Sequence, residues 1–455
     1  MSFFDQLTSL IEADASSSAS AADRLAAIGC PSTSIAILED GKISSHCYST
    51  IGNTSETIFQ ACSISKAVNA VGVMRLIDQG HLTLDSTIVQ VLPASALEIL
   101  TSGSPASHKK IIESITVRQL LSHTAGLSTP DFPGYPTSQE LPTSEQILLG
   151  VSPTNTMRVR LSALPGLEFN YAGGGTAVLQ VMVEHITKKP YAEALDELVI
   201  KPLNMARSFY GPLPDGEKNF APCYTNSTTP WKETHHNQPE LAAAGLWTTP
   251  SDLLKVISAV QASLTSDNGF LKQQTAKDMT TEVDSNVASG WFVPTDISFS
   301  HTGSNEPAYR CIVIGFKDKN NGISAMTNSP YGTYTILKTL QAAAHLRGWD
   351  INPAMGLYPV MTPFAEPVAG EDWKAWKGKW TDEKKRTYVF EGDEAPTLDF
   401  NGFGPIKVLK GAVKDKDVYV LDSLEMTLKL KEKDGKKELQ LVNQNTGTVT
   451  DLKKD

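Results

Sequence analysis

The sequence lacks the cysteine patterns that mark disulfide scaffolds and metal sites. Its five cysteines are scattered, and none stands in a C-x-x-C pair. The first residues, Met1 to Gln6, have no cationic region, apolar core or cleavage site of the kind found in signal peptides. An odd, sparse set of thiols in such a chain is typical of a reducing compartment. We therefore expect a cytoplasmic protein with reduced cysteines.

Long apolar runs and clusters of positive charge are also missing. No stretch approaches the roughly 20 apolar residues that cross a bilayer, so no membrane partner is expected. Lysine and arginine together number 40 against 50 aspartates and glutamates, which gives a formal charge of −10. This acidic balance argues against nucleic-acid binding, and no basic helix offsets it.

The 455 residues have room for one large domain and a smaller one, or for two to three medium domains.

What the chain does contain is a serine and a lysine one helical turn apart, Ser63 and Lys66, at the start of an apolar run. Positions i and i+3 share a helix face, so Lys66 can lie beside the Ser63 hydroxyl. A lysine desolvated at the positive end of a helix can act as the base that a serine nucleophile needs. The alternative, an ordinary N-cap serine with a solvated lysine, stays open on this motif alone. A second copy, Ser107 to Lys110, follows a Ser/Gly/Pro-rich run and is expected in a surface loop.

A second candidate is Tyr171, which precedes three glycines and an apolar helix. Small residues at a helix entrance let a phenol stand in a cleft without crowding. The glycines, Gly173 to Gly175, could instead cradle phosphate, but they match neither G-x-G-x-x-G nor G-K-[ST], so a nucleotide site is disfavoured. The remaining alternative for Tyr171 is a packed aromatic residue whose hydroxyl is hydrogen-bonded.

Two histidine sites invite a catalytic or metal interpretation. His123 ends a short predicted helix, and nothing in the sequence pairs it with an acid or a nucleophile, so a structural role is favoured. His235 and His236 have Glu233 and Glu240 nearby, but their spacing matches no recognised ligand set. Loop histidines are the favoured interpretation.

The order of elements predicts a large α+β domain and a small all-β domain. Asp40-Gly41 between two strand-like runs predicts a hairpin, and the prolines of 128–165 predict a long irregular segment. Four prolines in 352–369 indicate a linker, and alternating runs beyond it indicate strands, with Asp434-Gly435 as a hairpin turn. The expected domains are therefore 1–351 and 370–455, joined by 352–369.

Three motifs in chain order resemble the active-site motifs of the serine β-lactamase and penicillin-binding-protein superfamily. They are S-x-x-K at 63–66, Tyr171-Ala172-Gly173 and His301-Thr302-Gly303. The class C-like branch is most similar, with its family VIII esterases, D-aminopeptidases, transacylases and peptide cyclases. The resemblance covers about residues 5 to 350. It implies an antiparallel sheet flanked by helices, together with a helical lobe. The active cleft would lie where the lobe meets the sheet. The terminal domain resembles appended lipocalin-like domains, but is short for a closed eight-stranded sheet.

The same resemblance implies a role for each motif residue. Ser63 would be the acylated nucleophile, with Lys66 and Tyr171 as its base and proton shuttle. The substrate would lie beside Gly173 and along a strand formed by His301, Thr302, Gly303 and Ser304. The backbone N–H groups of Ser63 and Ser304 would form the oxyanion hole.

Two departures from the family pattern bear on the substrate. Gly173 stands where the family has an asparagine, which removes a side-chain amide. His301 stands where it has a lysine, which replaces a fixed cation with a titratable ring. Both changes weaken the case for β-lactams or a D-Ala-D-Ala carboxylate as the natural substrate.

These observations predict a serine hydrolase that cleaves an ester or amide of a small molecule or short peptide, without a metal or organic cofactor. Transfer of the acyl group to an amine or alcohol, as in a transacylase or peptide cyclase, is the first alternative. A non-catalytic scaffold or acyl-ligand binder is the second. The sequence does not indicate an oligomeric state.

Overall fold

The computed structural model describes residues 1–12, 19–317, 320–349, 366–367, 373–392, 396–402, 405–410, 418–421, 426–433, 436–443 and 448–455. The chain forms two compact units. We call Leu25–Ile336 the main unit, and Met1–Arg24 together with Leu337–Asp455 the second unit. The division falls inside two helices, α2 (Ala21–Ala27) and α14 (Gly332–Arg347). Most of the predicted linker, 352–369, lies outside the described residues.

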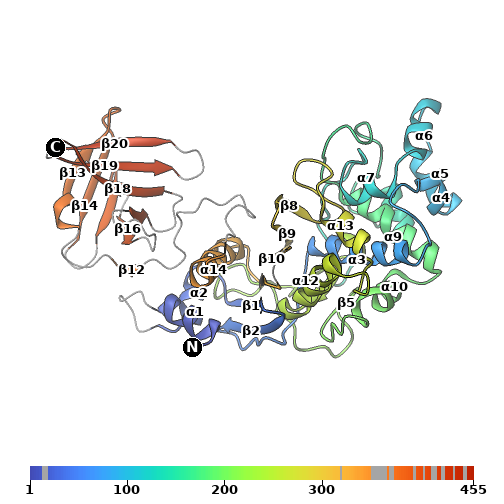
Figure 1. Ribbon diagram of the computed structural model, residues 1–455, viewed down its shortest axis with the longest axis horizontal. Coiled ribbons are helices and arrows are strands. Elements are labelled where there is room, and N and C mark those ends of the chain that lie inside the picture. The colour runs from blue at the N-terminus through green and yellow to red at the C-terminus, as the bar shows by residue number, and fades with distance from the viewer. Residues whose placement is uncertain are drawn as a thin grey trace. The chain divides into compact units, whose positions relative to one another are not determined.

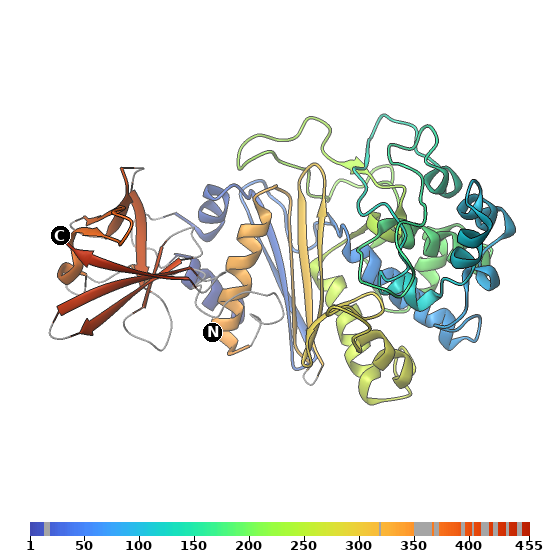
Figure 2. The same cartoon turned by 90° about the horizontal axis from the view of Figure 1, so that it is seen from above.

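A six-stranded antiparallel sheet forms one layer of the main unit, in the order β2-β1-β11-β10-β9-β8 (Figures 1 and 2). The predicted Asp40-Gly41 hairpin is confirmed, since both residues have positive φ, as a two-residue turn of this type requires. The interior strand β1 is buried almost throughout, whereas the edge strand β2 is largely exposed or half-buried. The strands are β1 (Ser32–Glu39), β2 (Lys42–Ser49), β8 (Phe292–Thr295), β9 (Ser298–Asn305), β10 (Tyr309–Phe316) and β11 (Gly322–Thr327).

Helices form the other layer of the main unit. The helix α12 (Pro250–Thr265) packs against β1, β10 and β11, and α3 (Ile64–Asp78) contacts β9 and β10. Figure 2 shows the sheet nearly edge-on, with α12 and the helical lobe on the same side. The lobe contains α4 (Ile88–Val91), α5 (Ala94–Thr101), α6 (Ala106–Glu113), α7 (Val117–Leu121), α8 (Ser144–Leu149), α9 (Gly173–Thr187) and α10 (Tyr191–Leu195), which continues as a π-helix (Asp196–Ile200). The remaining helices are α11 (Leu241–Ala244) and α13 (Gln273–Thr280).

The helix α3 is mostly apolar and is buried along most of its length. Only three of its residues, Arg75, Ile77 and Asp78, are not buried. A helix of this composition belongs in a core rather than at a surface. Its position at the junction of sheet and lobe fixes the place of its first turn, where Ser63 and Lys66 lie.

Short strand pairs tie the loops of the lobe together. One small sheet has the order β3-β7-β5, and β4 pairs with β6. The strands are β3 (Phe59–Gln60), β5 (Phe209–Tyr210), β7 (Leu246–Thr248), β4 (Tyr135–Pro136) and β6 (His236–Asn237).

The second copy of the S-x-x-K pattern is not in a loop, as the sequence suggested. Ser107 to Lys110 lie in α6, and all four residues are exposed. Pro105 stands at the N-cap of this helix, directly before its first residue. The Ser/Gly/Pro-rich run therefore marks a helix N-terminus.

The second unit contains a sheet whose pairing is cyclic. Eight consecutive antiparallel strands pair in sequence order, β20 pairs back to β13, and Glu366–Pro367 (β12) adds to β16. The expectation that this region is too short for a closed eight-stranded sheet was wrong, because strands of four to eight residues suffice. They are β13 (Gly378–Thr381), β14 (Thr387–Glu391), β15 (Thr397–Phe400), β16 (Pro405–Lys410), β17 (Val418–Leu421), β18 (Met426–Lys433), β19 (Lys436–Asn443) and β20 (Val449–Lys454). The predicted turn residues Asp434 and Gly435 lie outside the described residues.

Three tryptophans fill the core of this closed sheet. Trp373, Trp376 and Trp380 are each at most 1% exposed, and the Trp376 ring packs against Phe390 and Tyr419. The short 3-10 helix Lys374–Trp376 carries one of them. The sequence-predicted α+β fold with a terminal all-β region is thus confirmed. The second unit also contains α1 (Phe3–Glu12).

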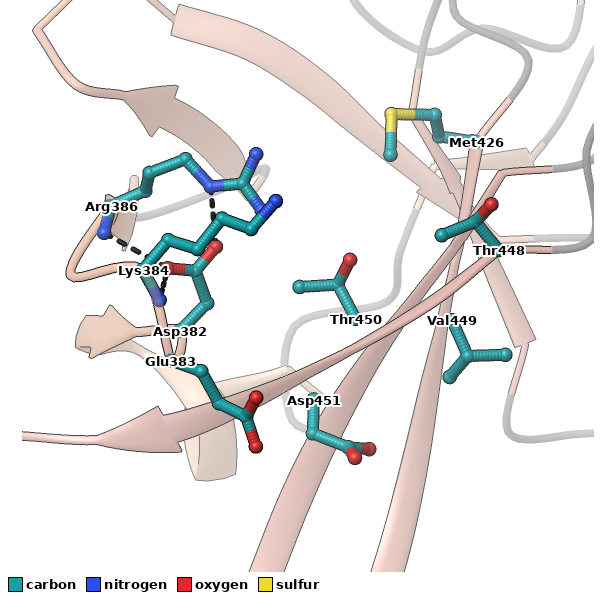
Figure 3. Close-up of a pocket in the computed structure, with 9 residues that line it drawn as sticks. All are labelled: Asp382, Glu383, Lys384, Arg386, Met426, Thr448, Val449, Thr450 and Asp451. Atoms are coloured by element: carbon teal, nitrogen blue, oxygen red, sulfur yellow. Dashed lines mark hydrogen bonds and ion pairs between the residues drawn. The ribbon is translucent and has the colours of Figure 1, made fainter.

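A pocket of about 460 Å³ opens on the closed sheet (Figure 3). Asp382 stands at its edge and accepts hydrogen bonds from Arg386 and from the Tyr388 hydroxyl. The wall of the pocket combines charged and apolar side chains, among them Lys384 and Met426. Within the described ranges, no helix has the length and apolar character of a bilayer-crossing segment.

Candidate active site

Ser63 occupies the N-cap position of α3, but its side chain does not cap the helix. The chain enters from β3 through Cys62, whose φ of 51° turns it sharply into the helix. The Ser63 side chain is half-buried, and its Oγ lies 3.0 Å from Lys66 Nζ. The ordinary N-cap interpretation therefore does not describe this serine.

Lys66 is almost completely buried, with 5% of its surface exposed. Its Nζ donates to the carbonyl oxygen of Ala243, at 3.0 Å, as well as to Ser63 Oγ. The Ala243 carbonyl belongs to α11, which packs against α3. Sequence reasoning missed this acceptor, because a backbone carbonyl carries no sequence signal.

Tyr171 lies in the same place. Its ring centroid is 5.0 Å from Lys66 Nζ, so the two segments that the sequence analysis singled out come together. The half-buried Tyr171 ring has two aromatic neighbours, and its centroid lies 4.4 Å from that of His123 and 6.4 Å from that of Phe292. Residues 63, 66 and 171 thus converge on one site.

The strand β9 carries His301 into the site, but as a neutral ring. His301 is 3% exposed, and its Nδ1 lies 2.6 Å from the Thr302 carbonyl oxygen. Because a carbonyl only accepts, Nδ1 carries the proton and Nε2 has a free lone pair. Burial lowers the pKa of His301 to about 3, and the charge of Lys66 adds to this shift while the bond to Thr302 opposes it. The titratable ring expected at this position is therefore neutral throughout the physiological range.

The end of β9 is an open edge. The partner strand β8 pairs no further along β9 than Ser300, and the side chains of Thr302 and Ser304 are exposed. Gly303 lies so close to the Ser63 loop that an added Cβ would stand 2.7 Å from the Ala61 carbonyl oxygen. A side chain at 303 would push the strand away from the serine, which explains the glycine.

The start of α9 has no room for the side-chain amide that the family pattern places at 173. A Cβ on Gly173 would meet the Phe132 ring at 2.6 Å and the Pro130 carbonyl oxygen at 2.9 Å. At Gly174 a Cβ would lie 2.3 Å from the Ser128 carbonyl oxygen. These glycines allow the 128–132 segment to cross the helix start, which accounts for them without a phosphate ligand.

Two buried amides link the segments around the site. Asn305 Nδ2 donates to Gln60 Oε1 at 2.8 Å and to the Ala244 carbonyl at 3.2 Å. Gln60 Nε2 in turn donates to the His236 carbonyl at 2.6 Å. The pair therefore connects β3, β9 and α11, the three elements that surround Ser63 and Lys66.

The other histidines have separate roles. His123 lies against Tyr171 and belongs to the site, which the sequence did not reveal because the contact joins residues far apart in the chain. His235 packs against the rings of Phe220 and Trp247, while His236 Nδ1 contacts the Pro133 carbonyl. Within the described ranges, no three His, Cys, Asp or Glu side chains converge in a way that could hold a metal ion.

Known proteins are similar to this chain over part of its length. Protein flp of Staphylococcus aureus strain N315 is 24% identical over 312 residues, which cover 66% of this chain and 59% of that protein. Esterase EstB of Burkholderia gladioli is 26% identical over 256 residues, covering 49% of this chain and 60% of that protein. The chain therefore spans about three fifths of the length of these curated relatives.

Solved structures show the same fold. The octameric penicillin-binding protein homologue from Pyrococcus abyssi has a TM-score of 0.58 at 20% identity, with both chains covered completely. A D-amino acid amidase from Ochrobactrum anthropi SV3 has a TM-score of 0.54 at 18% identity, covering 72% of this chain and 91% of that one. The Beta-lactamase family model matches residues 19–346. With that match spanning the S-x-x-K, tyrosine and His-Thr-Gly motifs, the chain belongs to the β-lactamase family.

Proposed function

We propose that this protein is a serine hydrolase that forms an acyl-enzyme on Ser63 and cleaves an ester or amide bond of a small molecule or short peptide. The observation that carries the proposal is the 3.0 Å separation of Lys66 Nζ and Ser63 Oγ, with the Tyr171 ring beside them. A serine hydroxyl is a weak nucleophile until a base removes its proton. Lys66 and Tyr171 are the candidate groups for that task.

In the proposed reaction, Lys66 and Tyr171 draw the proton from Ser63 Oγ as it attacks the carbonyl carbon. The backbone N–H groups of Ser63 and Ser304 hold the oxyanion, a contribution typically worth about 2.7–4 kcal/mol per donor. The leaving group takes its proton through Tyr171. Water then attacks the acyl-enzyme and releases Ser63.

The side chains around the nucleophile favour a neutral, apolar acyl group. His301 is uncharged, and Gly173 has no room for an amide, so neither offers the carboxylate or acylamide contact that the family pattern supplies. The Phe292 ring centroid lies 6.4 Å from that of Tyr171 and 6.4 Å from that of Phe169, so the three rings form one aromatic cluster. These aromatic side chains suit an apolar or aromatic acyl group better than a charged one.

The proposal is tested by labelling the serine. Incubation with a fluorophosphonate or an activated p-nitrophenyl ester should add one acyl or phosphonyl group per chain, detected by intact mass. The adduct should be absent from Ser63→Ala. No adduct on the wild-type protein, together with no turnover of a panel of esters and of D- and L-amino-acid amides, would favour the non-catalytic scaffold instead.

Acyl transfer is a second candidate function. The support is the pair of rings, His123 and Phe292, that lie beside Tyr171, because rings that shield an acyl-enzyme from water would favour an amine or alcohol as the acceptor. A structural neighbour at TM-score 0.55 is described as EstCE1, a hydrolase with promiscuous acyltransferase activity. Adding amine or alcohol acceptors to the ester assay separates the two functions, since transfer raises the yield of acylated acceptor relative to free acid.

A further inference from the structure

His123 contacts the segment around Tyr171 in three ways. Its ring lies 4.4 Å from the Tyr171 ring, centroid to centroid, with the planes tilted by 34°. Its Nδ1 accepts a hydrogen bond from the Ala172 N–H at 3.2 Å, and its carbonyl oxygen accepts one from the Asn170 N–H at 2.8 Å. One residue thus contacts the residue before the tyrosine, the tyrosine itself and the residue after it.

The backbone at His123 is held in a conformation that most residues avoid. Its φ is 56°, in the left-handed region, and it follows directly on the end of α7. The Thr124 N–H donates back to the Gln119 carbonyl at 2.9 Å, and the Ser122 and Thr124 hydroxyls are 2.9 Å apart. These bonds keep a strained residue in place, which is typical of functional sites.

The ring is neutral, and its tautomer is set by the backbone. Burial lowers the pKa of His123 to about 3, with further contributions from Lys66 and His301, the charged and titratable groups that face it from α3 and β9. Because the Ala172 N–H is a donor, Nδ1 must accept, and the proton therefore resides on Nε2. A neutral ring adds no charge of its own beside Tyr171.

Phe292 is a second aromatic neighbour of Tyr171. Its ring is nearly parallel to the Tyr171 ring, with centroids 6.4 Å apart and an interplanar angle of 17°. The backbone N–H groups on both sides of Tyr171 donate to His123. The position of Tyr171 is therefore tied to His123 through its backbone as well as through its ring.

We propose that His123 is a positioning residue, which holds the Tyr171 phenol in place beside Ser63 and Lys66 for the proton transfers. This inference rests on the serine hydrolase function proposed above. His123 acts through Tyr171 and does not itself contact the reacting atoms. Misplacement of a reacting group by about 1 Å typically costs on the order of 100-fold in rate, which sets the scale of the expected effect.

Two variants separate the contacts of His123. His123→Asn tolerates the left-handed backbone and keeps an acceptor near the position of Nδ1, but removes the ring. His123→Phe keeps a ring and removes the acceptor. The matched control is His108→Asn, which changes an exposed histidine on α6. Each variant is measured for kcat and KM with a p-nitrophenyl ester, for rate against pH, and for thermal stability.

We expect His123→Asn to lower kcat by about 10–100-fold with little change in KM, since it misplaces a reacting group without altering the substrate wall. In His123→Asn, the alkaline limb of the profile of rate against pH should shift. The control His108→Asn should match the wild type in kcat, KM and this profile. The deciding comparison uses Tyr171→Phe as background. If His123 acts through the phenol, His123→Asn causes no further loss of activity there.

An equal loss in the Tyr171→Phe background, or unchanged kcat in both His123 variants, would overturn the inference. Should His123→Asn fail to fold, as its thermal transition would reveal, the same comparison is made with His123→Phe. Failure of the proposed function looks different, because the wild-type protein would then show neither Ser63 labelling nor turnover.

Discussion

At the scale of single residues, Lys66 provides the most direct test of the chemistry. Lys66→Met keeps a long apolar stem in the buried position and removes the amine that contacts Ser63 Oγ. Loss of a general base typically costs about 100- to 10,000-fold in rate, so fluorophosphonate labelling of Ser63 should slow by that factor. The chain offers its own control in Lys110→Met, the lysine of the exposed S-x-x-K copy. Labelling at the wild-type rate in Lys66→Met would remove this lysine from the mechanism.

Glu240 is a second residue whose behaviour follows from its surroundings. It is fully buried, and neither carboxylate oxygen has a hydrogen-bond partner in the described part of the chain. Burial raises the pKa of Glu240 from 4.5 to about 7. The folded protein therefore keeps a proton that the unfolded chain has lost, so stability should fall as pH rises from about 4.5 to 7.

This shift predicts a pH-dependent gain in stability for Glu240→Gln. Ionising the buried carboxyl costs roughly 3 kcal/mol of folding free energy above pH 7, and the glutamine variant avoids that cost. Thermal unfolding of both proteins between pH 5 and 8 measures the effect. The difference in Tm should be small at pH 5 and should widen toward pH 8. A constant difference would show that Glu240 is charged and compensated in the folded state.

The sequence predicted the residues whose chemistry is local and missed those whose role depends on distant contacts. Ser63 and Lys66 are one helical turn apart, so their proximity follows from helix geometry alone. The neutral state of His301 depends on burial between elements, which spacing does not encode. His123 is 48 positions from Tyr171 in the chain and had no visible partner. The roles assigned to the site residues stay predictions until the labelling is done.

At the scale of elements, the paired amides Asn305 and Gln60 hold β9, β3 and α11 together. Asn305→Leu leaves the Gln60 amide oxygen and the Ala244 carbonyl without their donor, and each unsatisfied buried group costs about 1–3 kcal/mol. We therefore expect a lower unfolding free energy in urea, together with reduced kcat because α11 also carries the Ala243 carbonyl.

The matched control for this variant is Asn268→Leu, which changes an exposed asparagine in the turn after α12. It should leave both the unfolding midpoint and kcat close to the wild-type values. If Asn305→Leu behaves like this control, the amide pair does not position the site.

Element boundaries could be predicted where the sequence contains turn or cap signals. The Asp40-Gly41 hairpin is an example, since both turn residues have the positive φ that such a turn requires. At the start of α9, the sequence placed Gly173 beside the substrate but did not predict that the segment 128–132 crosses the glycines there, because that segment is an irregular loop. Irregular loops leave no periodic pattern, so their contacts cannot be deduced in advance.

At the scale of the whole molecule, the two units have separate hydrophobic cores. Units with their own cores can unfold separately, so thermal unfolding is expected to deviate from a single two-state transition. Trp373, Trp376 and Trp380 lie together in the second unit, and tryptophan fluorescence therefore reports strongly on it. Far-ultraviolet circular dichroism at 222 nm follows the helices of the main unit. Coincident transitions by both probes and by calorimetry would show that the units unfold as one.

The family and the general fold were predictable because three spaced motifs in the right order identify a scaffold more reliably than any single one. The division into domains remains a prediction, since most of 352–369 lies outside the described residues. Closure of the terminal sheet was not predictable, because cyclic pairing depends on contacts between its first and last strands, β13 and β20.

The cyclic pairing of β13 to β20 also limits how this protein can self-associate. β13 pairs with β14 and β20, and β20 pairs with β19 and β13, so neither strand is an open edge along its whole length. The contact between them joins Trp380 to Lys454 and Thr381 to Lys453. A foreign strand that adds along the whole of β13 or β20 would have to displace these pairs.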